Sequence, residues 1–304
     1  MSSQGQLKLA TAPTTAAQSA RRKWQMGKRG GELLGDIVAY IILIIGAVIM
    51  VGPFLWMLST ALKQPGDQFT RSLIPDPITF ENFQKLTEVL PFTTMLWNSI
   101  KIALITTVGQ ILTCAMGAFV FAVVRFRYRN VIFFLLLTTL MIPSQATLIP
   151  NFILFKWLGL YGTQTPLWLP AFWGGAFGTF LLRQYFMKIP LDLAESARVD
   201  GASLLAIFWR IYLPLARPAI AALTIFVFLG SWNNLLTALI YLPSDPQQTT
   251  LTVGLALLQA YQAQSGAPWT LMMAGAVASV APILLVFIFA QRQFIEGIAL
   301  SGMK

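Results

Sequence analysis

The sequence contains no histidine and only one cysteine. The absence of histidine excludes Ser-His-Asp and Cys-His catalysis, histidine-ligated haem and the usual zinc sites. Cys114 alone cannot form a disulfide within the chain or a cysteine metal cluster, and because it lies in an apolar run we interpret it as a small buried packing residue. The chain also lacks the G-x-x-x-x-G-K-[ST] phosphate loop, so any ATP-driven activity requires an ATPase on another chain.

Charged residues are scarce as well. They make up 11% of the 304 residues, while hydrophobic residues make up 56%. A soluble globular protein carries about 25% charged residues. The composition therefore predicts an all-α integral membrane protein whose spans pack as one domain. The net charge of +10 fits the basic cytoplasmic loops of such a protein, so we expect lipid contact and no nucleic-acid partner.

Long charge-free runs define the expected spans. Each run exceeds the roughly 20 residues that a membrane-crossing helix needs. We predict a transmembrane domain over 31–304 that follows a disordered basic cytoplasmic tail over 1–30, which is rich in Ala, Ser, Thr and Gln. Six transmembrane helices are expected, at about 37–62, 97–124, 130–155, 164–186, 217–243 and 270–291.

Basic residues gather on one side of this arrangement. They are concentrated in the N-terminal tail, in the loop after the second span and between the fourth and fifth spans, and the opposite loops hold far fewer. This bias predicts that both termini are cytoplasmic. On the other side, 63–96 is expected to be an irregular ordered loop, and 243–269 is either a partner-binding loop or a plain connector.

The expected spans carry no Asp, Glu, Lys or Arg in their central parts. Ion-coupled carriers usually need such residues, so their absence disfavours a secondary transporter. Polar interruptions do occur at Gln145 in the third span and at Trp232, Asn233 and Asn234 in the fifth. We interpret these as possible solute-path residues, with interhelical hydrogen bonding as the alternative. Three glycines of the fourth span are expected only to allow close helix packing: Gly174, Gly175 and Gly178.

The segment 192–214 is unusually charged for its surroundings. Asp192 is a predicted N-cap, with Glu195 three residues later, for a short helix over about 193–199. Asp200 and Gly201 form a turn signal. A second helix over about 204–213 is capped by Ser203 and is apolar almost all round, so it must be covered. The segment therefore predicts a helical hairpin at the cytoplasmic face, with a short polar helix suited to docking on another protein.

This segment resembles the EAA loop in permease subunits of bacterial ABC importers. That loop reads E-A-A, three residues, G, nine residues, then I-x-L-P, and the matching pieces here are Glu195-Ser196-Ala197, Gly201 and Ile211-Tyr212-Leu213-Pro214. Ser196 replaces the central alanine with another small residue. The stretches "MIPSQATLIP", "SWNNLL" and "QRQFIEGIALSGMK" are similar to the carbohydrate branch, near the second permease subunit of maltose-type importers, and the likeness extends over about 35–304.

The resemblance implies a subunit that is not itself an enzyme. It implies a multi-pass protein of a bacterial or archaeal cytoplasmic membrane that carries a sugar or oligosaccharide by alternating access. Its partners would be a second homologous permease subunit, an ATPase dimer and an extracytoplasmic solute-binding protein. ATP and Mg would be held by the ATPase, and this chain would bind no cofactor or metal. The ATPase contacts implied are Glu195, Ser196, Ala197, Asp200 and Gly201, together with Gly302 and Lys304 of the C-terminal tail.

Other functions remain open at this point. A polyol or a glycerol phosphate ester is an alternative solute for the same kind of importer. A self-sufficient secondary carrier or channel would transport without any ATPase, and the charged hairpin would then be dispensable. A membrane-embedded enzyme would need a catalytic constellation, and the sequence offers no clustered acids, histidines or metal ligands.

Overall fold

The computed structural model describes residues 15–242 and 245–301, with side chains at 35–242, 245–289 and 291. Within these residues every regular element is helical. The chain divides into two compact units, Met1–Trp56 and Met57–Lys304. Helix α1 covers Thr15–Ala61 and thus begins inside the segment 1–30 that the sequence predicts to be disordered. Ala, Gln, Arg and Lys, which are frequent from residue 15 onward, favour helix.

Helix α1 is apolar over its second half. Its Gly35–Ala61 portion is long and apolar enough to cross a membrane, and none of its most apolar window is buried within the protein. Ile42 is 64% exposed and Met50 is 75% exposed. A helix that is hydrophobic on all faces suits a lipid environment, which agrees with the expected first span.

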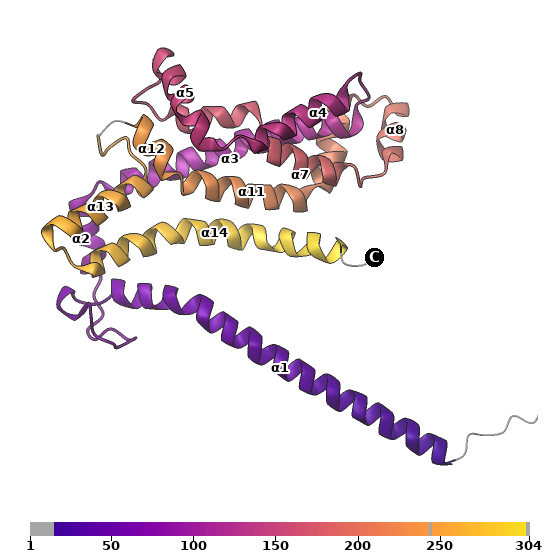
Figure 1. Ribbon diagram of the computed structural model, residues 1–304, viewed down its shortest axis with the longest axis horizontal. Helices are drawn as coiled ribbons and strands as arrows, with labels where there is room; N and C mark the ends of the chain where they lie inside the picture. Colours follow the sequence, from indigo (N-terminus) through magenta and orange to yellow (C-terminus); the bar gives the residue numbers. More distant parts are fainter. Residues whose placement is uncertain (1–14, 243–244, 302–304) are drawn as a thin grey trace, which may run out of the picture. The chain divides into compact units, whose positions relative to one another are not determined.

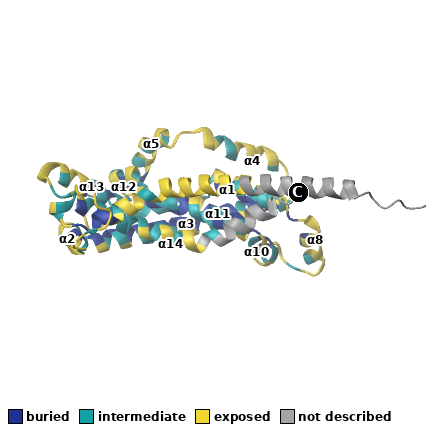
Figure 2. Ribbon diagram, turned by 90° about the horizontal axis from the view of Figure 1, so that it is seen from below, coloured by how far each residue is buried: buried dark blue, intermediate teal, exposed yellow. Residues whose placement is uncertain are grey.

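The second unit is built around α3 (Phe92–Val123), which packs on α7 (Ala176–Phe186) and α11 (Arg217–Trp232). Helix α14 (Trp269–Ser301) packs on α11 (Figure 1). Figure 2 shows buried residues along α3 and exposed residues over much of α4 and α5. A Cβ on Gly178 would lie 2.7 Å from Cys114 Sγ, and Cys114 is 0% exposed. The predicted packing roles of both residues are therefore confirmed.

The third expected span is not one continuous helix. Helix α4 (Arg129–Thr138) continues into the 3₁₀ turn η2 (Thr139–Met141), and α5 (Ser144–Trp157) follows at an angle of 97°. Pro143 stands at this break. Proline disfavours helix at the preceding residue and donates no backbone hydrogen bond. The prediction of a single helix over 130–155 is therefore wrong in its continuity.

The fourth and fifth expected spans are also interrupted. Two short pieces, α6 (Thr165–Trp168) and η3 (Leu169–Trp173), precede α7. Between them and α7, Gly174 has φ +81°, a left-handed conformation that favours glycine. Its role is therefore the turn, and the prediction of close helix packing is wrong for this residue, since a Cβ there would find its nearest neighbour at 3.8 Å. In the fifth span, α11 ends at Trp232 and α12 (Leu235–Tyr241) begins after Asn234.

Length and composition identify three single helices that could cross a membrane, or up to five when each bent pair is counted as one span. These counts apply to the described part of the chain. The three are Gly35–Ala61, Phe92–Val123 and Trp269–Phe289. The second bent pair joins Leu204–Leu215 to Arg217–Trp232 at 80°. The structure thus confirms an all-helical protein with several apolar helices.

The two long loops over 63–96 and 243–269 contain helices. The loop expected to be irregular holds η1 (Pro65–Asp67) and α2 (Glu81–Val89), and the other holds α13 (Leu251–Ser265). Buried Asn82 holds α2 in place: its Nδ2 donates to Ala61 O and Lys63 O, both at 2.8 Å, and its Oδ1 accepts from Thr270 Oγ1 at 2.9 Å. These bonds make the loop an ordered cap at one end of the second unit.

Candidate functional site

The predicted hairpin lies at the end of the second unit opposite α2 and α13 (Figure 1). Its first arm is α8 (Leu191–Val199). Its second arm is a continuous helical stretch of α9 (Leu204–Ile207), the π-helical turn η4 (Phe208–Tyr212) and α10 (Leu213–Leu215). The N-cap of α8 is Pro190, with no side-chain cap, and Asp192 stands in the first turn. The predicted N-cap role of Asp192 is therefore wrong, although a carboxylate in the first turn still favours the helix dipole.

The turn between the arms confirms the sequence prediction. Gly201 has φ +83°, which costs other residues about 1–2 kcal/mol. Its N–H donates to Arg198 O at 3.0 Å, and Ala202 N–H donates to Ala197 O at 2.9 Å, so the last carbonyls of α8 are satisfied. Ser203 Oγ accepts from Ala206 N–H at 3.2 Å and caps the second arm as expected.

The second arm is anchored in the core of the unit. Ile207, Phe208 and Tyr212 are all at most 2% exposed. The ring of Tyr212 makes edge contacts with Phe119 on α3 and Phe186 on α7, with centroids 5.1 and 5.4 Å apart. The opposite side of this arm is uncovered, since Leu205 is 60% exposed. The expectation that this apolar helix needs cover is thus met by protein on one face only.

The first arm presents its polar side outward. Glu195, Ser196, Asp200 and Gly201 are exposed, whereas Ala197 is half-buried against the core cluster. Ser196 Oγ donates to Asp192 O at 2.7 Å, so its hydroxyl is satisfied within the helix. Four of the five predicted coupling residues are therefore accessible to a partner. The small side chain of Ala197 instead allows α8 to pack closely against the core of the second unit.

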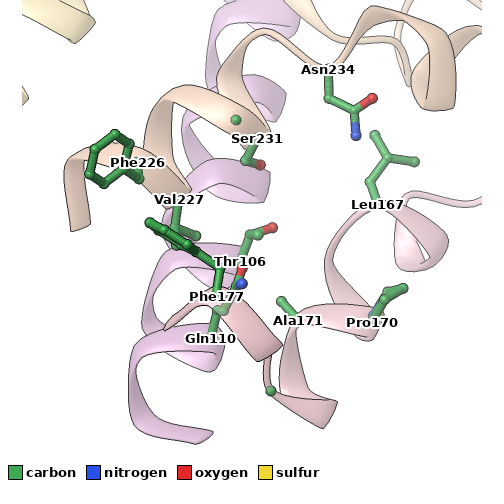
Figure 3. A pocket seen from close by; sticks show the side chains of 12 residues that line it. Thr106, Gln110, Leu167, Pro170, Ala171, Phe177, Phe226, Val227, Ser231 and Asn234 are labelled. Atoms are coloured by element: carbon green, nitrogen blue, oxygen red, sulfur yellow. The ribbon is translucent and has the colours of Figure 1, made fainter. Parts of the chain in front are cut away.

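A cavity of about 440 Å³ lies at the other predicted site, within the second unit (Figure 3). Asn234 lines it, but Gln145, Trp232 and Asn233 do not. Trp232 is 3% exposed and stacks on Phe228 with centroids 5.6 Å apart, so it is a core residue. The cavity also has polar lining residues that were not predicted from the sequence: Thr106, Gln110 and Ser231. They lie in apolar helices with no local signal, and only the packing of α3 against α11 brings them together.

No group of three or more metal-ligating side chains occurs among the described residues. The predicted tail contacts Gly302 and Lys304 lie outside the part of the chain that the structure describes. The hairpin and the cavity are therefore the two candidate sites in the described part of the chain.

Several long apolar helices and two bent helix pairs are typical of an α-helical membrane protein. The chain belongs to the family described as "Binding-protein-dependent transport system inner membrane component", whose model matches residues 92–299. The match contains both the hairpin and every residue that lines the cavity.

Curated relatives match most of the chain. The lactose transport system permease protein of Rhizobium radiobacter is 33% identical over 264 residues, covering 87% of this chain and 95% of the relative. The arabinooligosaccharides transport system permease protein of Halalkalibacterium halodurans is 38% identical over 248 residues, covering 81% and 86%. The sn-glycerol-3-phosphate transport system permease protein of Yersinia pestis is 33% identical over 273 residues, covering 86% and 95%.

The fold also matches solved structures. A bacterial ABC transporter involved in the import of the acidic polysaccharide alginate has a chain that superposes with a TM-score of 0.73 at 26% identity, covering 88% of this chain and 98% of that one. The alginate transporter in complex with a pentasaccharide-bound periplasmic protein gives a TM-score of 0.61 at 18% identity, which shows the fold alone.

Proposed function

We propose that this chain is a permease subunit of an ATP-driven importer that carries a sugar or oligosaccharide across a bacterial or archaeal cytoplasmic membrane. The family match over 92–299 carries this proposal. The named solutes of two relatives, lactose and arabinooligosaccharides, support a carbohydrate. A glycerol phosphate ester is the second candidate, because another relative of similar identity transports sn-glycerol 3-phosphate.

The hairpin is the proposed coupling element to a separate ATPase dimer, which would hold ATP and Mg. Its first arm offers Glu195, Ser196, Asp200 and Gly201 at the surface, and its second arm is fixed by Tyr212 and Phe208. A movement imposed on α8 is therefore passed through packed rings to α3 and α7. A rigid lever of this kind suits alternating access, in which one packed element moves another between two arrangements.

The remaining assembly follows from the same proposal. With the six spans that the sequence predicts, both termini would lie on the cytoplasmic side with the hairpin and the tail residues Gly302 and Lys304, as the distribution of basic residues favours. The ordered cap of α2 and α13, at the opposite end of the unit, then faces an extracytoplasmic solute-binding protein. A second homologous permease subunit would complete the path.

A photo-crosslinking amino acid at Ser196 tests the coupling role. In membranes that contain the intact complex, we expect a crosslink to a chain that mass spectrometry identifies by its phosphate-loop sequence. The matched control is the same amino acid at Gln84, which is exposed on α2 at the opposite end. Equal ATPase capture from both positions, or none from Ser196 in a complex that copurifies with its ATPase, would argue against the hairpin as the contact.

A further inference from the structure

The cavity is formed by elements that are far apart in the sequence. Thr106 and Gln110 come from α3, Ser231 from the end of α11 and Asn234 from the break before α12. Figure 3 shows these side chains around the same space. A volume of about 440 Å³ falls within the range of small-molecule sites, which run from about 300 to 1,000 Å³.

Several polar groups at this cavity have no partner within the described residues. Thr106 is 9% exposed and its buried Oγ1 makes no hydrogen bond. By contrast, Thr107 and Thr113 on the same helix donate to the carbonyls of Ala103 and Gly109, at 2.6 and 2.8 Å. A buried hydroxyl that is left unsatisfied is costly, so the position of Thr106 calls for a ligand or water in the cavity.

The two amides add directional donors. Asn234 Oδ1 accepts from Thr237 N–H at 3.2 Å, which leaves the Nδ2 donors of Asn234 available. The Gln110 amide is only half-buried, and no hydrogen bond of its side chain is found in the described structure. Together with the hydroxyl of Ser231, these groups offer both donors and acceptors, as a solute with several hydroxyls requires.

Among the described residues that line the cavity there is no Asp, Glu, Lys or Arg. Its apolar side includes Phe177 and Phe226, whose rings meet edge to face with centroids 5.7 Å apart. An anionic solute placed here would lose hydration without gaining a cationic side chain, which is unfavourable in a membrane interior. The N-terminus of α7 beside Phe177 offers only the partial positive charge of a helix dipole.

Gly175 controls the place of the Gln110 amide. A Cβ on Gly175 would lie 2.6 Å from Gln110 Nε2, too close for the amide to stay where it is. The backbone of Gly175 is held on both sides by Cys114, whose Sγ accepts from Gly175 N–H at 3.2 Å and donates to Gly175 O at 3.4 Å. The predicted packing role of Gly175 is therefore specific: it leaves room for a cavity side chain.

We infer that this cavity is a solute-contact site within the chain itself, and that it takes uncharged polyhydroxylated solutes and rejects phosphorylated or carboxylated ones. The inference rests on the proposed importer function and narrows its solute class. It decides between neutral and anionic solutes, both of which occur among the similar transporters. Gln110 and Asn234 bind hydroxyl groups, and Gly175 positions Gln110.

Thiol protection in the intact complex tests the site without a solute-binding protein. Gly230→Cys places a thiol at the cavity without removing a polar group, since an added Cβ there meets no atom within 4 Å, and the parental protein with its buried Cys114 gives the background. The probes are lactose, arabinotriose, sn-glycerol 3-phosphate and an alginate trisaccharide. We expect at least one neutral sugar to slow modification by N-ethylmaleimide and neither anion to do so. Protection by an anion as strong as that by any sugar would overturn the inference.

Variants then separate a binding role from a structural one. Gln110→Leu is expected to raise the half-protecting sugar concentration about tenfold, the effect of losing one good hydrogen bond, while Gln84→Leu on the exposed face of α2 leaves it unchanged. Gly175→Ala should raise the half-protecting concentration by a similar factor. In the double variant with the shorter Gln110→Asn, the rise should be smaller than the two single effects combined. Strict additivity of the two changes would remove the positioning role of Gly175.

ATP-dependent uptake of the same four probes distinguishes the two levels of proposal. If the complex transports a neutral sugar but that sugar does not protect the introduced thiol, the importer function is supported and the cavity site is contradicted. If the complex transports none of the probes and no probe protects the thiol, both the proposed function and the cavity site are contradicted.

Discussion

At the scale of single residues, the hairpin depends on a conformation that few side chains accept. Gly201 has φ +83°, and no neighbouring atom lies within 4 Å of where its Cβ would be. The constraint on this residue is therefore backbone geometry and not space. The Asp-Gly dipeptide predicts a turn from sequence alone, which is why this turn was predictable.

Two substitutions at Gly201 separate geometry from side-chain size. Gly201→Val forces a β-branched residue into the left-handed region and is expected to cost about 1–2 kcal/mol in the turn, lowering solute-stimulated ATPase activity while the protein still inserts into membranes. Gly201→Asn tolerates this region better and should retain most of the activity. The check is ATPase activity of the reconstituted complex at equal protein level, and equal losses in both variants would refute the geometric account.

At the scale of elements, helix positions were easier to predict than helix breaks. Apolar run length located the helical segments, because burial in lipid depends on composition over many residues. The break at Pro143 could have been anticipated from proline chemistry. The breaks at Gly174 and at Asn233 could not, since glycine and asparagine also occur within helices and only tertiary packing selects the interrupted form.

The packing of the second arm of the hairpin can be tested directly. Tyr212 is fully buried, yet its hydroxyl has no hydrogen-bond partner in the described residues. Tyr212→Phe removes an unsatisfied hydroxyl and is expected to be neutral or stabilising. Tyr212→Ala removes the ring contacts with Phe119 and Phe186 and should cost about 3–5 kcal/mol, as other large-to-small core changes do. Thermal unfolding of the purified complex measures the stability of both variants. If Tyr212→Phe destabilises the protein as much as Tyr212→Ala, the hydroxyl makes an essential hydrogen bond and the prediction is wrong.

At the scale of the whole molecule, the proposed contacts with the ATPase and with the solute-binding protein lie at opposite ends of the second unit. The hairpin lies at one end, the ordered cap of α2 and α13 lies at the other, and the uncharged cavity lies within the same unit. The hairpin motif was readable because its residues are contiguous. The cavity was mostly hidden, because Gln110 and Ser231 lie more than a hundred positions apart in the sequence and meet only in the fold.

Transport by the intact complex in proteoliposomes is the most direct test of the proposed function. With ATP, the ATPase subunits and the solute-binding protein present, we expect uptake of a neutral sugar, and we expect Gly201→Val to reduce that uptake together with ATP hydrolysis. Uptake that continues at the same rate without the ATPase subunits, and that the hairpin variant leaves unchanged, would contradict an ATP-driven importer and favour a self-sufficient carrier.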